Sequence, residues 1–211
     1  MSVAFTALLL AGSGCAMRTV KVSGYAEPQA RYQLTQGATL GVEPNDKAEN
    51  PILARQIEYK LKMALNNSGW RVVSGQAVPL SLSFTFGTDK GTESRSRAIT
   101  EPGRPVTVKT RDEKGNVTYT EVETPSQTRY VQEQVTVYEQ WLKIKVTDSA
   151  NKQAVWIGEA FYGSSSDDPR TVMDYLIAAL VKTFGRDTQR QIRVTLKDED
   201  PVLQSIRMAT P

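Results

Sequence analysis

The chain has 211 residues, of which 39% are hydrophobic and 23% charged, with a formal net charge of +3. This composition supports one globular domain with its own core, and the mixed charges, which form no block of five, disfavour a dedicated nucleic-acid binder. Because the chain has no histidine and Cys15 is its only cysteine, a Ser-His-Asp triad, a histidine-ligated metal site and an intrachain disulfide are excluded, and we expect no cofactor and no metal.

Residues 1–14 predict a signal peptide. The uncharged apolar run over residues 2–11 is too short for a membrane span, which needs about 20 residues, and small residues at 12–14 separate it from Cys15. This order resembles the lipobox of bacterial lipoproteins, which implies that Cys15 is acylated and anchors the chain. Ala16 stands where an aspartate would imply retention in the inner membrane, so the resemblance implies the outer membrane. The alternative is an ordinary secretory signal, and because a charged leader is missing, we expect the natural chain to begin further upstream.

Two polar stretches flank a predicted domain of residues 37–197. Residues 15–36 show no sustained hydrophobic period, so we expect a lipidated tether there, with at most one edge strand around residues 30–34. Residues 198–211 are expected to form a loosely held tail.

The domain begins with a predicted strand, a helix and a second strand. Residues 38–42 form the first strand. Asn50 followed by Pro51 predicts the start of a helix, and apolar residues recur every four positions from Leu53 to Leu65, which gives the helix one buried stripe. The chain resumes as a strand after the Ser-Gly that ends the helix.

A half-buried strand and a long polar segment come next. Residues 80–86 alternate between large apolar residues and Ser or Thr, as in a strand with one buried face. Residues 88–134 are rich in Thr, Arg, Glu and Lys, yet their valines alternate on both sides of a turn at residues 113–116. This pattern predicts a long polar hairpin that projects from the domain.

The last part of the domain predicts a second hairpin, a helix and a strand. Residues 135–146 and 154–162 form the hairpin, Asp168 and Pro169 open the helix, and residues 192–196 form the last strand. The fold class is therefore α+β: a mainly antiparallel sheet with two helices packed on one face and a long projecting polar β-hairpin.

Two segments carry a family resemblance. The helix end Ser-Gly-Trp-Arg-Val-Val up to Val73, and the strand Val-Trp-Ile-Gly-Glu-Ala from Val155, resemble the DUF4136-like bacterial lipoproteins. The similarity covers residues 38–184 apart from the polar hairpin. It implies an envelope lipoprotein of unknown activity and assigns no catalytic residue.

One loop and four carboxylates are candidates for a site. The loop before the second helix could hold an anion or a cation or contact a partner, and helix capping explains the same residues. The loop consists of Ser164, Ser165, Ser166, Asp167 and Asp168. The carboxylates that could pair as in a glycoside hydrolase are Glu121, Glu123, Glu139 and Glu159. Their alternation predicts that they face water, so we assign no catalytic residue.

These observations favour a non-enzymatic cell-envelope lipoprotein, a structural or accessory component that contacts other envelope proteins or further copies of itself. The first alternative is a binding module for a small or polymeric envelope ligand, and the second is a carboxylate-based hydrolase. We expect the chain on the outer membrane, facing the periplasm, with the membrane as a partner through Cys15 and with no nucleic-acid partner.

Overall fold

The computed structural model describes residues 17–74 and 78–209, which form two compact units. The larger, which we call the sheet unit, comprises the described residues up to Lys90 and from Tyr138 onwards. The smaller, which we call the ribbon, is Gly91–Val137, and it overlaps residues 88–134, where the sequence predicts a polar hairpin. Cys15 and the predicted signal peptide lie outside the described residues.

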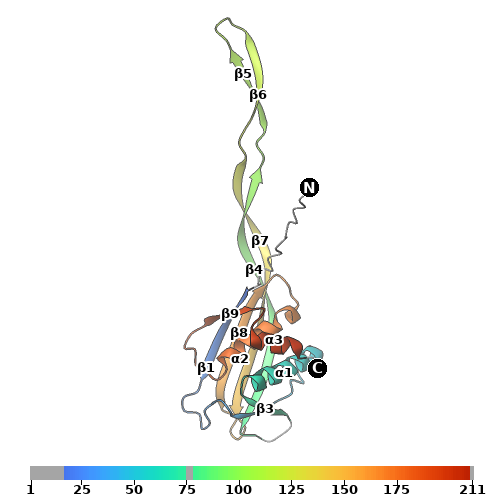
Figure 1. The fold of residues 1–211 in the computed structure, drawn as a ribbon, viewed down its shortest axis with the longest axis vertical. Coiled ribbons are helices and arrows are strands. Elements are labelled where there is room, and N and C mark those ends of the chain that lie inside the picture. Colours follow the sequence, from blue (N-terminus) through green and yellow to red (C-terminus); the bar gives the residue numbers. More distant parts are fainter. Residues whose placement is uncertain (1–16, 75–77, 210–211) are drawn as a thin grey trace, which may run out of the picture. The chain divides into compact units, whose positions relative to one another are not determined.

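Nine strands, three α-helices and one short 3₁₀ helix make up the described part of the chain (Figure 1). They are β1 (Met17–Ala26), β2 (Thr39–Val42), α1 (Pro51–Asn67), β3 (Arg71–Ser74), β4 (Leu80–Glu101), β5 (Pro105–Arg111), β6 (Val117–Glu123), β7 (Gln127–Asp148), β8 (Ala154–Ser164), η1 (Pro169–Thr171), α2 (Met173–Thr183), β9 (Ile192–Lys197) and α3 (Pro201–Met208). The strand order is β3-β2-β4-β7-β8-β1-β9 in the large sheet, and β5 pairs with β6 in a second sheet. The fold is α+β, as expected, with a mixed and mostly antiparallel sheet.

The parallel part of the sheet contains the strands on either side of helix α1 in the sequence, β2 and β3. Strand β2 pairs in parallel with both β3 and β4. Helix α1 lies between β2 and β3 in sequence and supplies the crossover that the parallel pairing of β2 with β3 needs. The predicted start of α1 is confirmed, since the Asn50 side chain accepts a hydrogen bond from the backbone N–H of Leu53 at 3.0 Å. The predicted stripe is also confirmed, and Ile57, Leu61 and Leu65 are buried.

Strand β1 replaces the tether that the sequence led us to expect over its residues. Met17–Ala26 pairs with β8 on one side and with β9 on the other, so it is an inner strand of the sheet. Val20 and Val22 are fully buried, whereas Thr19 and Lys21, which alternate with them, are exposed. The tether prediction was wrong here because two alternating valines among polar residues give too weak a signal, and the partners of β1 lie at least 130 residues away along the chain. No strand forms at residues 30–34.

The C-terminal segment also differs from the expected loose tail. Asp200 caps α3 by accepting a hydrogen bond from the N–H of Val202, and Pro201 occupies the first turn. Leu203 and Ile206 of α3 are fully buried, and α3 contacts both α1 and α2. This short helix is therefore part of the core of the sheet unit.

Helix α2 and an aromatic cluster fill the middle of the core. Helix α2 lies against β1, β8 and β9, and nearly all of its side chains are buried. The Trp156 indole is buried, lies 4.7 Å from the Phe184 ring between centroids, and donates a hydrogen bond to the carbonyl of Arg186 at 3.0 Å. Gly158 leaves room for this ring, because a Cβ there would lie 2.1 Å from Cη2 of Trp156.

Candidate functional site

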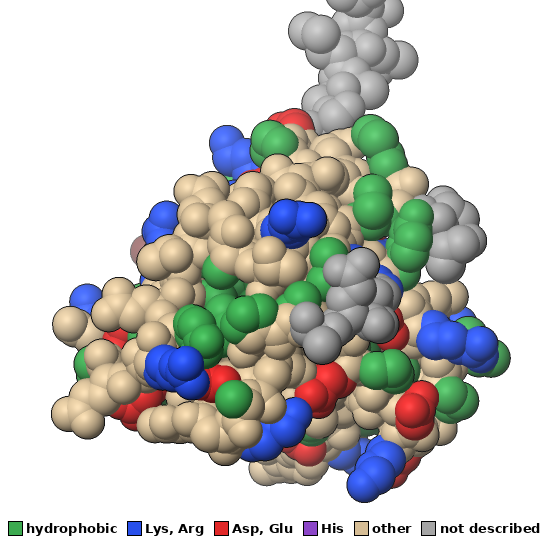
Figure 2. All heavy atoms as spheres, turned by 90° about the horizontal axis from the view of Figure 1, so that it is seen from below, with side chains coloured by type: hydrophobic (Ala, Val, Ile, Leu, Met, Phe, Trp, Pro, Cys, Tyr) green, Lys and Arg blue, Asp and Glu red, His purple; other side chains and the backbone are tan. Residues whose placement is uncertain are grey.

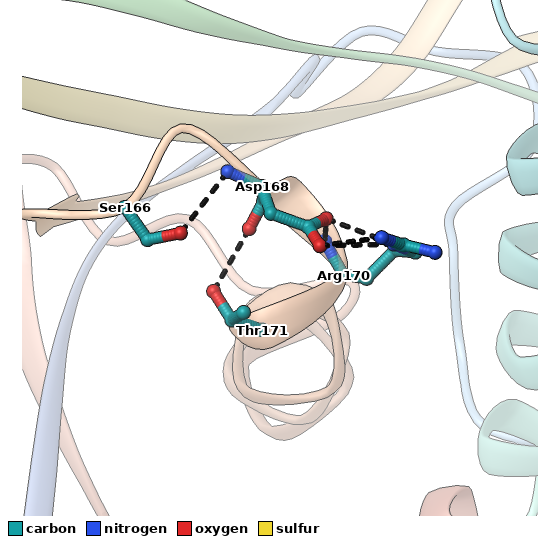
Figure 3. Close-up of polar contacts among 4 residues, drawn as sticks. All are labelled: Ser166, Asp168, Arg170 and Thr171. Atoms are coloured by element: carbon teal, nitrogen blue, oxygen red, sulfur yellow. Dashed lines mark hydrogen bonds and ion pairs between the residues drawn. The ribbon is translucent and has the colours of Figure 1, made fainter.

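The predicted loop of Ser164 to Asp168 is held by hydrogen bonds within itself (Figure 3). The N–H of Ser166 donates to the Ser164 hydroxyl at 3.0 Å, and the N–H of Asp168 donates to the Ser166 hydroxyl at 3.2 Å. The carbonyl of Asp168 accepts from the Thr171 hydroxyl at 2.8 Å. The loop is also fastened from the core side, where the buried Gln140 amide donates to the carbonyl of Ser166. Ser165 and Asp167 are exposed.

Asp168 at the end of the loop has partners for both of its carboxylate oxygens. It accepts from the N–H of Arg170 at 3.0 Å and forms a two-pronged ion pair with the Arg170 guanidinium, at 2.9 and 2.7 Å (Figure 3). These hydrogen bonds hold the pKa of Asp168 below its usual range. Capping, the alternative that the sequence left open, accounts for this geometry. Contact of this loop with a ligand or partner stays a prediction.

The four candidate carboxylates are divided between the two units. Glu121 and Glu123 belong to β6 in the ribbon, whereas Glu139 and Glu159 belong to the sheet unit. In the sheet unit each carboxylate is paired with a lysine: Glu139 with Lys21 at 3.4 Å, and Glu159 with Lys143 at 2.6 Å. Both carboxylates of the sheet unit therefore have a cationic neighbour.

A pocket that the sequence analysis missed lies in the sheet unit beside Trp141. It has a volume of about 580 Å³ and is lined by the segment from Asn45 to Asn50, the β4 residues from Thr85 to Asp89, and Pro169 directly after the predicted loop. The Trp141 indole forms one wall and lies on the backbone of Gly87, where a Cβ would be 2.6 Å from Cζ2 of the indole. The only sequence signal was a glycine that interrupts an alternating strand.

A second cluster of polar groups joins α2, β9 and α3. The buried Tyr175 hydroxyl donates to Asp198 at 2.7 Å, and Arg207 donates both to that hydroxyl and to Asp198, at 2.7 and 2.9 Å. The Arg18 guanidinium lies 4.6 Å from the centre of the Tyr175 ring. Burial, and then the hydrogen bond to Asp198, raise the pKa of Tyr175, while the hydrogen bonds from Tyr175 and Arg207 lower the pKa of Asp198. The cluster fastens α3 to the core.

This cluster predicts a pH dependence of stability. Because the folded Asp198 has a lower pKa than the unfolded one, it stabilises the fold above the ordinary carboxyl pKa, and this contribution disappears as the pH falls towards the lowered value. We therefore expect Asp198→Asn to reduce stability at neutral pH and to flatten the loss of stability below about pH 4 in urea unfolding curves. Asp46→Asn, which changes an exposed carboxylate after β2, is the control. If stability fell as steeply with decreasing pH in Asp198→Asn as in the unmodified chain, Asp198 would not be the source of this pH dependence.

The ribbon contains two ladders of paired strands and no core. In one ladder β5 pairs with β6, and every residue of both strands is exposed. In the other, the parts of β4 and β7 that belong to the ribbon lie side by side, with side-chain hydrogen bonds from Ser94 to Gln132 and between Thr100 and Thr128. The turn between β5 and β6 is closed by Asp112, which accepts from the N–H groups of Lys114 and Asn116.

Surface charge, metal-ligand clusters and membrane-spanning helices were the remaining features to consider in the described residues. Basic and acidic side chains are interspersed over the face in Figure 2, without an extended area of one charge, in agreement with the mixed composition. In the part of the chain that the structure describes, no group of three acidic, histidine or cysteine residues is placed to hold a metal ion. Within the same residues, no helix has the length and apolar character needed to cross a membrane.

Comparison with known proteins assigns no family. No family model and no curated protein matches the chain, so the resemblance to DUF4136-like lipoproteins stays a prediction. A PDZ domain protein from Parabacteroides distasonis is similar in structure, with a TM-score of 0.44 and 10% identity, over 86% of this chain and 39% of that one. The chain thus spans well under half the length of that protein.

Two structures of PelC dodecamers from Paraburkholderia phytofirmans are also similar. One has a TM-score of 0.41 and 15% identity over 79% of this chain and 98% of that one. The other has a TM-score of 0.39 and 14% identity over 82% of this chain and 100% of that one.

Proposed function

We propose that the protein is a non-enzymatic accessory protein of the bacterial cell envelope, and that the ribbon is its contact arm for other envelope proteins. The observation that carries this proposal is the exposure of the ribbon's large hydrophobic side chains. Tyr130 is 75% exposed, Tyr119 65%, Val106 48% and Val122 47%. A two-stranded ribbon is at best marginally stable in water, so a partner that covers such residues would explain why the chain builds it.

The sheet unit supports the proposal by supplying a stable base. In this proposal the helices cover one face of the sheet, as the sequence predicts, and leave the face with Lys21, Lys143 and Glu159 to water. In the same unit the carboxylates of Asp168, Glu139 and Glu159 each have a cationic partner, which favours a scaffold over a catalyst. The outer edges of a two-stranded ribbon carry unpaired backbone N–H and C=O groups, and proteins use such edges to bind further strands.

Replacement of the ribbon tests the contact arm. We expect a variant in which a short Gly-containing turn joins Lys90 to Tyr138 to keep its fold, because the ribbon buries little apolar surface and loop length affects closure entropy only weakly. Its melting temperature should change modestly, while the envelope proteins that co-purify with the whole chain from detergent-solubilised membranes should be lost. Retention of the same partners by the folded variant would refute the arm.

The pocket beside Trp141 supports a second candidate, a ligand-binding module. Its volume of about 580 Å³ is in the range of small-molecule sites, and it combines an aromatic wall with polar groups such as Asn45 and Asp89. Trp141→Ala distinguishes the two candidates. If the variant without the ribbon keeps its partners and Trp141→Ala loses them, the pocket is the functional site.

We also propose that Cys15 anchors the chain in a membrane. The support is the order of the amino-terminal sequence, in which an apolar run and small residues precede the sole cysteine. Cys15→Ser should release the protein from the membrane fraction or leave it unprocessed, and labelled fatty acid should enter only the unmodified chain. Equal membrane association of both chains, with no label in either, would contradict the anchor.

A further inference from the structure

The charged side chains within the strands of the ribbon all lie on one face, whereas the charges of its turns lie outside these strands. The strand residues Gly91–Glu101, Pro105–Arg111, Val117–Glu123 and Gln127–Val137 include ten charged side chains, and all ten have odd numbers. They are Glu93, Arg95, Arg97, Glu101, Lys109, Arg111, Glu121, Glu123, Arg129 and Glu133. Since successive strand residues point to opposite faces, the even-numbered positions form a face with no charge.

The pairing of the strands keeps the two faces separate across both ladders. In β5 and β6, Val106 lies opposite Val122 and Val108 opposite Thr120, so even-numbered residues pair with even-numbered residues. In β4 and β7, the Thr100 and Thr128 hydroxyls are 3.2 Å apart on the same face. The ion pair of Glu101 with Arg129, at 2.8 Å, lies among the odd-numbered residues. Each ladder therefore has one charged and one uncharged face.

The uncharged face is made mostly of hydroxyl and β-branched side chains. Its residues are Thr92, Ser94, Ser96, Ala98, Thr100, Val106, Val108, Thr110, Thr118, Thr120, Val122, Thr128, Tyr130, Gln132, Gln134 and Thr136. A charged partner surface would lose its water against this face without gaining a counter-charge, which is costly. A hydrocarbon surface would leave the hydroxyl and amide groups without hydrogen bonds, which is costly too. The chemistry of the face thus selects a neutral partner that carries hydrogen-bonding groups of its own.

We infer that this uncharged face binds the same face of a second copy of the chain. A hydroxyl group both donates and accepts, so a face of threonines and serines is complementary to itself. Side chains on one face of a strand repeat about every 6.8 Å, and a second ribbon offers the same repeat. A two-fold axis would place one patch against its equal, as in most dimers. The inference deepens the proposed function, on which it rests, by naming the partner of the contact arm.

The size of the face sets the expected strength of the dimer. Stable interfaces contain roughly 20–30 residues a side, and the sixteen residues here fall below that range. The association should therefore be weak in solution and increase with concentration. It would be favoured where a membrane anchor holds copies close together.

The test compares lysine substitutions on the two faces of the same strands. Val108→Lys and Thr120→Lys place a charge on the uncharged face, whereas Thr107→Lys and Tyr119→Lys place it on the charged face one residue away. The purified full chain is measured by sedimentation velocity from about 1 to about 100 µM. We expect a monomer–dimer equilibrium, weakened at least about tenfold by the first pair and less than about threefold by the second.

A single-cysteine experiment gives a readout that a loss of folding would not imitate. In a Cys15→Ser background the chain has no thiol, so Val108→Cys or Thr120→Cys adds the only one. A bismaleimide of about 10 Å reach, the usual distance between stacked sheets, should link two copies through these positions but not through Thr107→Cys or Tyr119→Cys. Equal linking from both faces would overturn the assignment of the face and indicate pairing through the strand edges.

The remaining outcomes separate this inference from the proposed function. If the chain stays monomeric up to about 100 µM and Val108→Lys loses the envelope partners, the inference of a second copy is overturned. The contact-arm proposal then stands, with a different protein bound to the same face. A chain that dimerises through this face, but keeps all envelope partners when the ribbon is replaced, would support the inference and refute the arm as the site for those proteins.

Discussion

Trp156→Ala should lower the free energy of unfolding by about 3–5 kcal/mol, the largest loss expected from a single truncation in this chain. The indole is 1% exposed and packs against Phe184, so its removal leaves a cavity between the sheet and the end of α2. It also leaves the carbonyl of Arg186 without its donor. Chemical denaturation followed by circular dichroism measures the loss.

The glycine under the indole supplies an independent check with a matched control. In Gly158→Val the new side chain would occupy the space of the Trp156 ring, and this overpacking should cost about 1–3 kcal/mol. Gly163→Val lies in the same strand, at a position where a Cβ would meet nothing within 4 Å, and should change stability little. Equal stability of the two variants would mean that the indole does not lie across Gly158.

Val20→Asp should destabilise the fold by at least about 3 kcal/mol, although its residue lies in a segment whose sequence predicts a tether. Val20 is fully buried and sits opposite Val194 of β9, so an aspartate there would be a charge without a partner in the core. The unfolding free energy from urea titrations is the measurement.

Thr19→Asp is the control for this substitution. Thr19 is exposed on the face of β1 opposite to that of Val20. Its hydroxyl contacts the hydroxyl of Thr195 on the same face. A change within about 1 kcal/mol is expected. If Val20→Asp were tolerated as well as Thr19→Asp, β1 would not be an inner strand of the sheet in solution.

Local patterns in the sequence were enough to predict two of the three described helices and most strands, whereas α3 lies where a loose tail was expected. The cap at Asn50 and the stripe from Leu53 to Leu65 depend on residues three or four positions apart, so they specify α1 without knowledge of its neighbours. Helix α2 was predicted in the same way, although it is buried on nearly all sides and not along one stripe. The segregation of charge in the ribbon follows from the two-residue period of a strand, whereas only the pairing of β5 with β6 shows that like faces of the two strands lie together.

The tertiary structure alone decided the place of β1 and the composition of the pocket. Two valines in a polar segment become core residues only because β8 and β9, far along the chain, flank them, and no local period reports such long-range pairing. The pocket wall at Trp141 likewise depends on Gly87, 54 residues earlier, and on the segment around Asn45. The sequence by itself determined α1, most of the strands and the alternation of their faces, but neither β1 nor α3. Only the fold could decide which of those faces meet, because burial is set by contacts between residues that the chain brings together from a distance.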